Sequence, residues 1–187
     1  MPVIRESGER EAMLDIAKLM MVSARTAPKS GGIDDIVLAL VHGEEKEHIA
    51  LEMERIAKER NSAGFVRDSG NVHNSDAILL VGLKGPKTFG LNCGACGYGT
   101  CEQFQQVGRK EGSDFVGPTC IFKSLDMGIA LGSAAKTAGL LNADSRIMYR
   151  IGTAAKKLQF IPEAHVIMGI PISARGKSIY FDRPQTK

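Results

Sequence analysis

The feature that most constrains this chain is a set of four cysteines, its only ones, in the spacing C-x2-C-x4-C-x18-C. They are Cys93, Cys96, Cys101 and Cys120. Four thiolates with none left over match the ligand count of a tetrahedral zinc ion or of a 4Fe–4S cluster. The spacing therefore indicates a metal centre built on one short segment of the chain.

The spacing favours a cluster over zinc. A structural zinc site usually uses two C-x2-C pairs, and the second pair is absent here. A zinc knuckle also begins C-x2-C-x4, but it continues with histidine where this chain has Cys101. Three close thiolates and one distant thiolate are typical of iron–sulfur proteins. Zinc, and thiols that bind no metal, remain as alternatives.

Glycine and proline around the cysteines fit this interpretation. We expect Gly94, Gly97 and Gly99 to adopt positive φ and to bring backbone N–H groups close to sulfur. Pro118 is expected to stiffen the approach of Cys120.

Three aromatic residues near the cysteines are candidates to shield a cluster from water. They are Tyr98, Phe104 and Phe115. Packing of a small local core is the alternative role, and it is the better interpretation of Phe115.

The composition is that of an ordinary globular protein. The 187 residues are 43% hydrophobic and 24% charged, enough for one domain with a core. The net charge of +3 is small and spread along the chain, so no nucleic-acid partner is expected. We find neither a signal peptide nor a membrane-length apolar stretch, so we expect a cytoplasmic protein without membrane insertion. In a reducing compartment, closely spaced cysteines bind metal or do redox chemistry rather than form structural disulfides.

Hydrophobic periodicity predicts an α/β (α+β) fold. The expected helices span residues 7–27, 44–60, 124–141 and 144–158, and the expected buried strands span 36–41, 77–83 and 164–172. Because helix and strand alternate over the first 83 residues, we expect parallel strand pairing. Residues 84–120, called the cysteine segment below, are glycine-rich and loop-rich. We interpret them as an iron–sulfur insert in a domain formed by residues 1–83 and 121–187.

The stretch "LNCGACGYGTCEQF", followed by Cys120, resembles the four-cysteine 4Fe–4S domain of anaerobic redox machinery. That domain typically reads C-G-x-C-G-x-x-x-C-x-x-[FY/A] before its final cysteine, and all four ligand positions match. The whole chain is similar to uncharacterised ferredoxin-domain proteins of anaerobic bacteria and archaea. The resemblance implies a 4Fe–4S cluster on the four cysteines and electron transfer in anaerobic metabolism.

The flanking segments are similar to flavin-dependent nitroreductases. "ARTAPKSGGIDDIVLALV" resembles their A-P-S-x-G-N-x-Q-P-W stretch, and "GTAAKKLQFIPEAHVIMGIPISARGKSIYFDRP" resembles their C-terminal segment. The small-residue helix from Asp126 would match the helix that builds the dimer interface in that family. This resemblance implies a nitroreductase-like sheet with covering helices, a homodimer and FMN as a possible cofactor.

The chain departs from nitroreductases where they bind flavin. It lacks the R-R-S-x-R segment, for which Arg5 is a partial substitute. Gly32 and Asp35 stand where that family has Asn and Gln, and an anionic Asp35 is a poor replacement for an amide donor. If a flavin binds, the candidates to meet its phosphate are Arg25, Lys29, Arg175 and Lys177.

Three functional hypotheses follow. The first is an iron–sulfur protein that passes electrons to a redox partner protein or a small-molecule acceptor. The second is an FMN-dependent oxidoreductase with an accessory cluster, and the third is a zinc-stabilised binding or structural module. The scattered histidines form no metal motif, and no catalytic triad or phosphate-binding loop points to a substrate.

Overall fold

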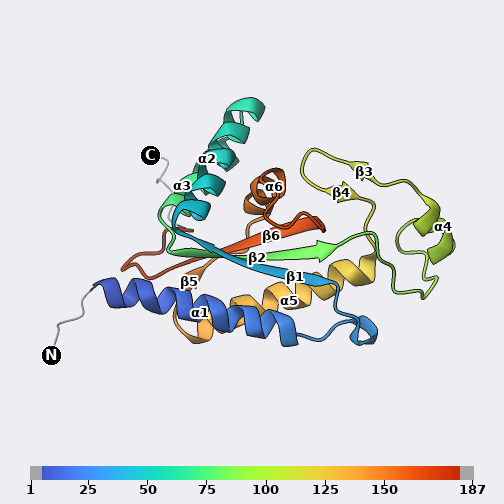
Figure 1. Cartoon of the computed structure of the whole chain (residues 1–187), viewed down its shortest axis with the longest axis horizontal. Coiled ribbons are helices and arrows are strands. Elements are labelled where there is room, and N and C mark those ends of the chain that lie inside the picture. Colours follow the sequence, from blue (N-terminus) through green and yellow to red (C-terminus); the bar gives the residue numbers. More distant parts are fainter. Residues whose placement is uncertain (1–5, 182–187) are drawn as a thin grey trace.

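The computed structural model describes residues 6–181, which form three layers (Figure 1). A four-stranded sheet lies in the middle. One face of the sheet is covered by α1 (Glu6–Thr26) and α5 (Ile121–Leu140). The other face is covered by α2 (Gly43–Arg60), α3 (Ala63–His73) and α6 (Tyr149–Lys157). No described helix is both long and apolar enough to cross a membrane.

The sheet is antiparallel throughout, so the predicted parallel pairing is wrong. Its order is β1 (Ile36–His42), β2 (Ala77–Lys84), β6 (Ala164–Ser173) and β5 (Asp144–Ser145). The reason is α3, which the periodicity did not reveal. Together α2 and α3 form a helical pair that returns the chain to the end of the sheet where β1 finishes (Figure 1). The next strand must therefore run back along β1, and His42 pairs with Ala77.

The two sheet faces bury two separate apolar cores. Along β2, Leu79 and Val81 pack in the core beneath α1 and α5, whereas Ile78 and Leu80 pack in the core beneath α2 and α6. This alternation is the two-residue period of a strand buried on both faces, as predicted for β2. The strand β1 was also predicted to be buried, but it is an edge strand and most of it is only half-buried.

Most of the helix predictions are confirmed to within a few residues. The helix α2 ends as expected at Asn61, whose φ of 47° lies in the left-handed region. The helix predicted over 144–158 is shorter, spanning only Tyr149–Lys157. Its first residues form β5 instead, because Asp144 pairs with Ser173 of β6.

The cysteine segment lies beyond one end of the main sheet (Figure 1). It contains α4 (Cys101–Gln106) and a separate two-stranded sheet of β3 (Lys110–Glu111) and β4 (Val116–Gly117). Within residues 85–120, only Phe104 and Cys120 are buried. The segment therefore has almost no core of its own. Its status as a separate inserted domain stays a prediction.

Candidate metal centre

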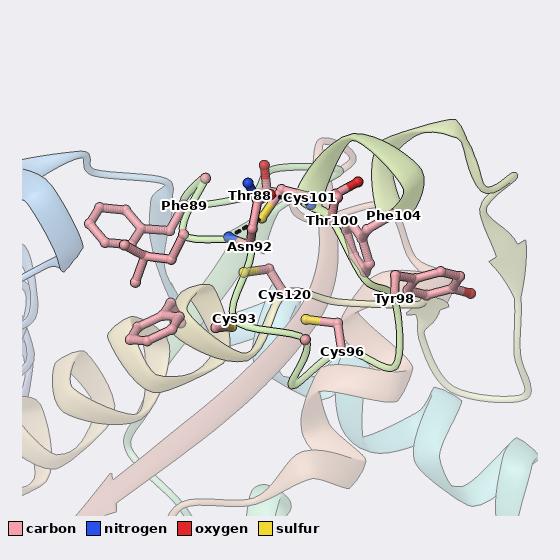
Figure 2. Close-up of a pocket in the computed structure, with 14 residues that line it drawn as sticks. Thr88, Phe89, Asn92, Cys93, Cys96, Tyr98, Thr100, Cys101, Phe104 and Cys120 are labelled. Atoms are coloured by element: carbon pink, nitrogen blue, oxygen red, sulfur yellow. Dashed lines mark hydrogen bonds between the residues drawn. The ribbon is translucent and has the colours of Figure 1, made fainter.

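All four cysteines line one pocket, called the cysteine pocket below (Figure 2). Cys93 and Cys96 come from the loop after β2, Cys101 is the first residue of α4, and Cys120 is the N-cap of α5. Exposure falls along the set, from an exposed Cys93 to a buried Cys120. The structure thus brings the predicted ligands together, although no group of His, Cys, Asp or Glu within residues 6–181 is arranged to hold a metal ion. Their role as ligands stays a prediction.

The first turn of α5 points its backbone donors at two of the sulfurs. The Ile121 N–H donates to Cys96 Sγ at 3.3 Å. The N–H groups of Phe122 and Lys123 donate to the Cys120 sulfur. The first N–H groups of a helix have no partner within the helix, and this end carries a partial positive charge. The start of α5 is therefore suited to negatively charged sulfur.

These donors affect the pKa values of the Cys120 and Cys96 thiols differently. Burial alone would raise the pKa of Cys120, but N–H groups of Lys123, Phe89 and Phe122 outweigh it and lower that pKa below its ordinary value. Burial also raises the pKa of Cys96, and there the single Ile121 donor does not offset it. Cys120 is therefore the easier of the two to convert to the thiolate that binds metal.

Cys101 is held by Asn92 from two directions. The Asn92 N–H donates to Cys101 Sγ at 3.4 Å, and Asn92 Oδ1 accepts the Cys101 N–H at 2.8 Å. A capping box fixes the start of α4, with Gln103 N donating to Thr100 Oγ1 at 3.1 Å and Thr100 N donating to Gln103 Oε1 at 3.2 Å. The sequence T-C-E-Q matches the capping-box pattern, and this signal was missed in the sequence analysis. No simple sequence pattern predicts the role of Asn92.

The glycine expectation holds in part. Gly94 and Gly97 have φ of 72° and 84°, whereas Gly99 has no positive φ. The Gly97 N–H does not reach sulfur, because it closes a turn by donating to Gly94 O at 2.9 Å. Donors to sulfur come instead from Asn92, Phe89 and the start of α5.

Aromatic rings form the apolar wall of the cysteine pocket. Tyr98 and Phe104 are among its lining residues, as expected, and their rings meet edge to face with centroids 5.7 Å apart. Phe115 is not among its lining residues. Phe89 and Phe122 were missed by sequence reasoning, and their rings also lie 5.7 Å apart.

Three buried charges lie beneath the first turn of α5. Lys123 Nζ lies 2.8 Å from Asp35 Oδ2 and 3.8 Å from Asp126 Oδ2. Asp126 Oδ1 also accepts hydrogen bonds from the Ser30 N–H and hydroxyl, both at 2.8 Å. This network ties η1 (Ser30–Gly32), which precedes β1, to α5. The Asp35 carboxylate is therefore ion-paired with Lys123.

The four cations proposed for a flavin phosphate do not converge within one chain. Arg25 donates to Ile36 O at 2.8 Å, and Lys29 donates to Ala24 O at 2.9 Å. Arg175 lies 3.0 Å from Asp76 Oδ1, at the far end of β2, and Lys177 follows two residues later. Since β2 separates the two ends of the sheet, the pairs lie roughly 20 Å apart. Arg5 lies outside the described residues.

Solved structures with a similar fold include nitroreductases. A nitroreductase with bound FMN from Desulfitobacterium hafniense DCB-2 matches with a TM-score of 0.57, over 92% of this chain and 82% of its own, at 13% identity. Nitroreductase A from Vibrio parahaemolyticus matches with a TM-score of 0.53 at 10% identity, over 95% of this chain but only 61% of its own length. The chain thus has a nitroreductase-like fold and spans about three fifths of the second protein.

Sequence comparison points to a ferredoxin-domain family. Residues 116–183 match a family model described as "Uncharacterized protein containing a ferredoxin domain", a range that includes Cys120 but not the other cysteines. A protein of Archaeoglobus fulgidus, described as "Uncharacterized protein", is 52% identical over 186 residues, covering 99% of this chain and all of its own. The chain therefore belongs to the same protein family as this archaeal protein.

Proposed function

We propose that the chain is an iron–sulfur protein that holds one 4Fe–4S cluster through Cys93, Cys96, Cys101 and Cys120 and transfers electrons. The observation that carries this proposal is the gathering of all four cysteines around one pocket at the start of α5. The ferredoxin domain named in the matching family model supports it.

The residues around the cysteine pocket have distinct roles in this proposal. A 4Fe–4S cluster, when bound, accepts and releases single electrons at a potential set by its surroundings. The N–H donors from Asn92 and Ile121 stabilise negative charge on sulfur. The Phe104 ring keeps water from one side of the pocket, and exposed Cys93 marks the side open to a partner.

A metal also explains how the cysteine segment is stabilised. Residues 85–120 bury only Phe104 and Cys120, so apolar burial contributes little to their folding. Where a metal site supplies the missing stability, binding and folding are coupled. Closure of the four sulfurs around iron would then be part of cluster assembly. The electrons would pass to a redox partner protein or a small-molecule acceptor.

Anaerobic purification followed by analysis of iron, acid-labile sulfide, zinc and flavin tests this proposal. We expect about four irons and four sulfides per chain and no zinc. One zinc per chain without sulfide would support the zinc-stabilised module. Absence of iron and sulfide under strict anaerobiosis would refute the cluster.

The same analysis on Cys120→Ala tests the ligand set. We expect this variant to lose the four-iron form. Ser124→Ala is the matched control, because the Ser124 hydroxyl donates to the Cys120 carbonyl on the same turn without being a ligand. Unchanged iron content in Cys120→Ala would exclude Cys120 as the fourth ligand.

An FMN-dependent oxidoreductase is the second candidate, supported by the fold shared with the FMN-bound nitroreductase of D. hafniense. The residues of one chain do not fit a flavin phosphate, because Arg25 and Arg175 lie at opposite ends of the sheet and Asp35 is paired with Lys123. Flavin released on denaturation would support this candidate, and its absence would remove it.

A homodimer is proposed through the outer face of α5. Ile121, Leu125 and Ile129 recur every four residues there and are 39%, 52% and 46% exposed. A Cβ atom at Gly128 or Gly132 would have no atom of the described residues within 4 Å, so a second helix has room to approach closely. Sedimentation analysis should find a dimer that Leu125→Glu dissociates. Leu51→Glu, at an exposed position of α2, is the control, and a monomeric wild type would contradict the proposal.

A further inference from the structure

A second pocket shares a wall with the cysteine pocket. It lies between Tyr98, the turn after α4 at Val107 and Gly108, and the β3–β4 hairpin at Phe115 and Pro118. Its cavity volume is about 470 Å³, within the range of small-molecule sites. We call it the hairpin pocket.

The shared wall is aromatic. Tyr98 lines both pockets, and its ring packs edge to face against Phe104 of the cysteine pocket. In Figure 2 the Tyr98 ring points away from the cysteine sulfurs, with its hydroxyl outermost. A molecule in the hairpin pocket would therefore be separated from the sulfurs by two side-chain rings and not by a layer of water.

The walls of the hairpin pocket are held by contacts within the cysteine segment and by contacts to α2. The Arg109 guanidinium lies 4.4 Å from the Phe104 ring centroid and donates to Phe104 O and Val107 O. On the far side of the hairpin, Arg60 of α2 donates to Asp114 and to Ser113 O, both at 2.6 Å. These contacts hold both walls of the pocket in place, which lowers the entropy cost of binding.

The lining selects a flat, mostly apolar ligand. Phe115, Tyr98 and Pro118 offer apolar faces. At Gly108 and Gly117 a Cβ atom would meet nothing, so the backbone leaves open space there. Exposed Lys110 adds a positive charge, and the carboxylate of Glu111, which also lines the pocket, lies 3.9 Å from Lys156 Nζ. Stacking on aromatic rings with one cation nearby suits a planar aromatic ring that carries an anionic group.

We propose that the hairpin pocket binds a planar aromatic electron carrier with an anionic substituent and that this carrier exchanges electrons with the cluster. One electron leaves the reduced cluster and enters the ring of the carrier, and no covalent bond forms or breaks. The redox partner of the proposed function reloads the cluster. The electron-transfer step rests on that proposed function, whereas binding of the carrier does not.

Calorimetric titration of the anaerobically purified protein with anthraquinone sulfonate tests the binding. We expect saturable binding that Gly108→Leu weakens at least about tenfold, because the added side chain fills the pocket. Gly176→Leu is the matched control, since Gly176 is also exposed, has no positive φ and would place its Cβ in open space. Equal affinity of wild type and Gly108→Leu, or no saturable binding by wild type, would overturn the proposal.

Two further measurements separate the pocket from the cluster. Lys110→Gln should weaken binding of the sulfonate but not of menadione, which is flat and uncharged, and equal loss for both probes would contradict the role of Lys110.

Iron and sulfide are measured on every sample. A chain without iron refutes the proposed function, but its titration with the probe still decides whether the pocket exists. In iron-loaded protein reduced with dithionite, Gly108→Leu should slow reduction of the probe without changing iron content.

Discussion

Glycine has different uses in the cysteine segment and in the rest of the described chain, residues 6–83 and 121–181, which we call the body. In the body, Gly152 and Gly169 allow α6 to lie directly on β6. In the cysteine segment, Gly94 and Gly97 turn the backbone. A Cβ atom at Gly152 would lie 1.6 Å from Ile167 O, and one at Gly169 would lie 2.2 Å from an Ile151 methyl carbon. A Cβ at Gly97 would meet nothing, but its φ is 84°. At the contact of α6 with β6 glycine is needed for close packing, and at Gly94 and Gly97 it is needed for backbone conformation.

Burial divides the two regions in the same way. The body has two apolar cores, one on each face of the sheet. Within residues 85–120, Phe104 and Cys120 alone are buried. The body is therefore stabilised by its own packing, and the cysteine segment depends on its contacts with the body and, in our proposal, on iron.

The largest loss of stability is expected where the cysteine segment joins the body. Lys123→Met removes the cation between Asp35 and Asp126 and leaves two buried carboxylates without it. Removal of one partner from a buried ion pair typically lowers the free energy of unfolding by about 3–5 kcal/mol. Urea denaturation measures the loss. Lys136→Met, at an exposed position of α5, is the control, and equal midpoints for the two variants would contradict the role of the network.

The next effect tests close packing in the body. Gly152→Ala forces α6 away from Ile167 of β6 and should lower the free energy of unfolding by about 1–3 kcal/mol. Gly70→Ala in α3, where a Cβ would meet nothing, should not destabilise the protein. Thermal unfolding of both variants checks this, and a stable Gly152→Ala variant would show that the helix and strand can separate freely.

A smaller effect is expected in the cysteine segment. Gly97→Ala places a Cβ on a left-handed residue at a cost of about 1–2 kcal/mol. Because the strain falls on the segment, iron should be lost to a chelator faster while the unfolding midpoint of the body stays unchanged. Gly108→Ala, whose φ is not positive, should retain iron like the wild type. Equal iron loss from both variants would contradict the distinction between the two uses of glycine.

The smallest effect concerns a histidine in the body. His73 Nδ1 lies 2.6 Å from Glu47 and Nε2 lies 3.0 Å from Glu54. Burial alone would lower the pKa of His73, but the hydrogen bonds to these carboxylates outweigh it and raise the pKa. Its ion pairs therefore stabilise the fold fully below the unfolded pKa of about 6.5 and are lost as pH rises through the folded pKa.

Urea midpoints of wild type and His73→Gln at several pH values check this expectation. The difference should be greatest below about pH 6 and should shrink as the pH rises through the raised folded pKa of His73. The iron content should not change, because α2 and α3 lie outside the cysteine segment. A difference that grows with pH would contradict the sign of the pKa shift.

Much of the fold was predictable because apolar periodicity follows burial. The buried strand β2 and the helix α2 lie where their patterns placed them. The helix α3 was missed because its buried face includes Asp68, paired with Arg67 and Arg150, and hydrophobic patterns do not detect such residues. Without α3, the strand direction could not be predicted.

For the candidate site, spacing revealed the cysteines but not their surroundings. Nothing local to the sequence brings Phe89 and Phe122 together, since they meet only when the segment folds against α5. The ion pair of Asp35 with Lys123 joins residues 88 positions apart and is equally invisible. These contacts depend on tertiary structure, which single-sequence patterns do not encode.

Native mass spectrometry of the anaerobically purified chain tests the central claim most directly. The account predicts a mass above that of the polypeptide by four irons and four sulfides, and loss of that form in Cys120→Ala but not in Ser124→Ala. A mass equal to that of the bare polypeptide, or of the polypeptide with one zinc, would contradict the account.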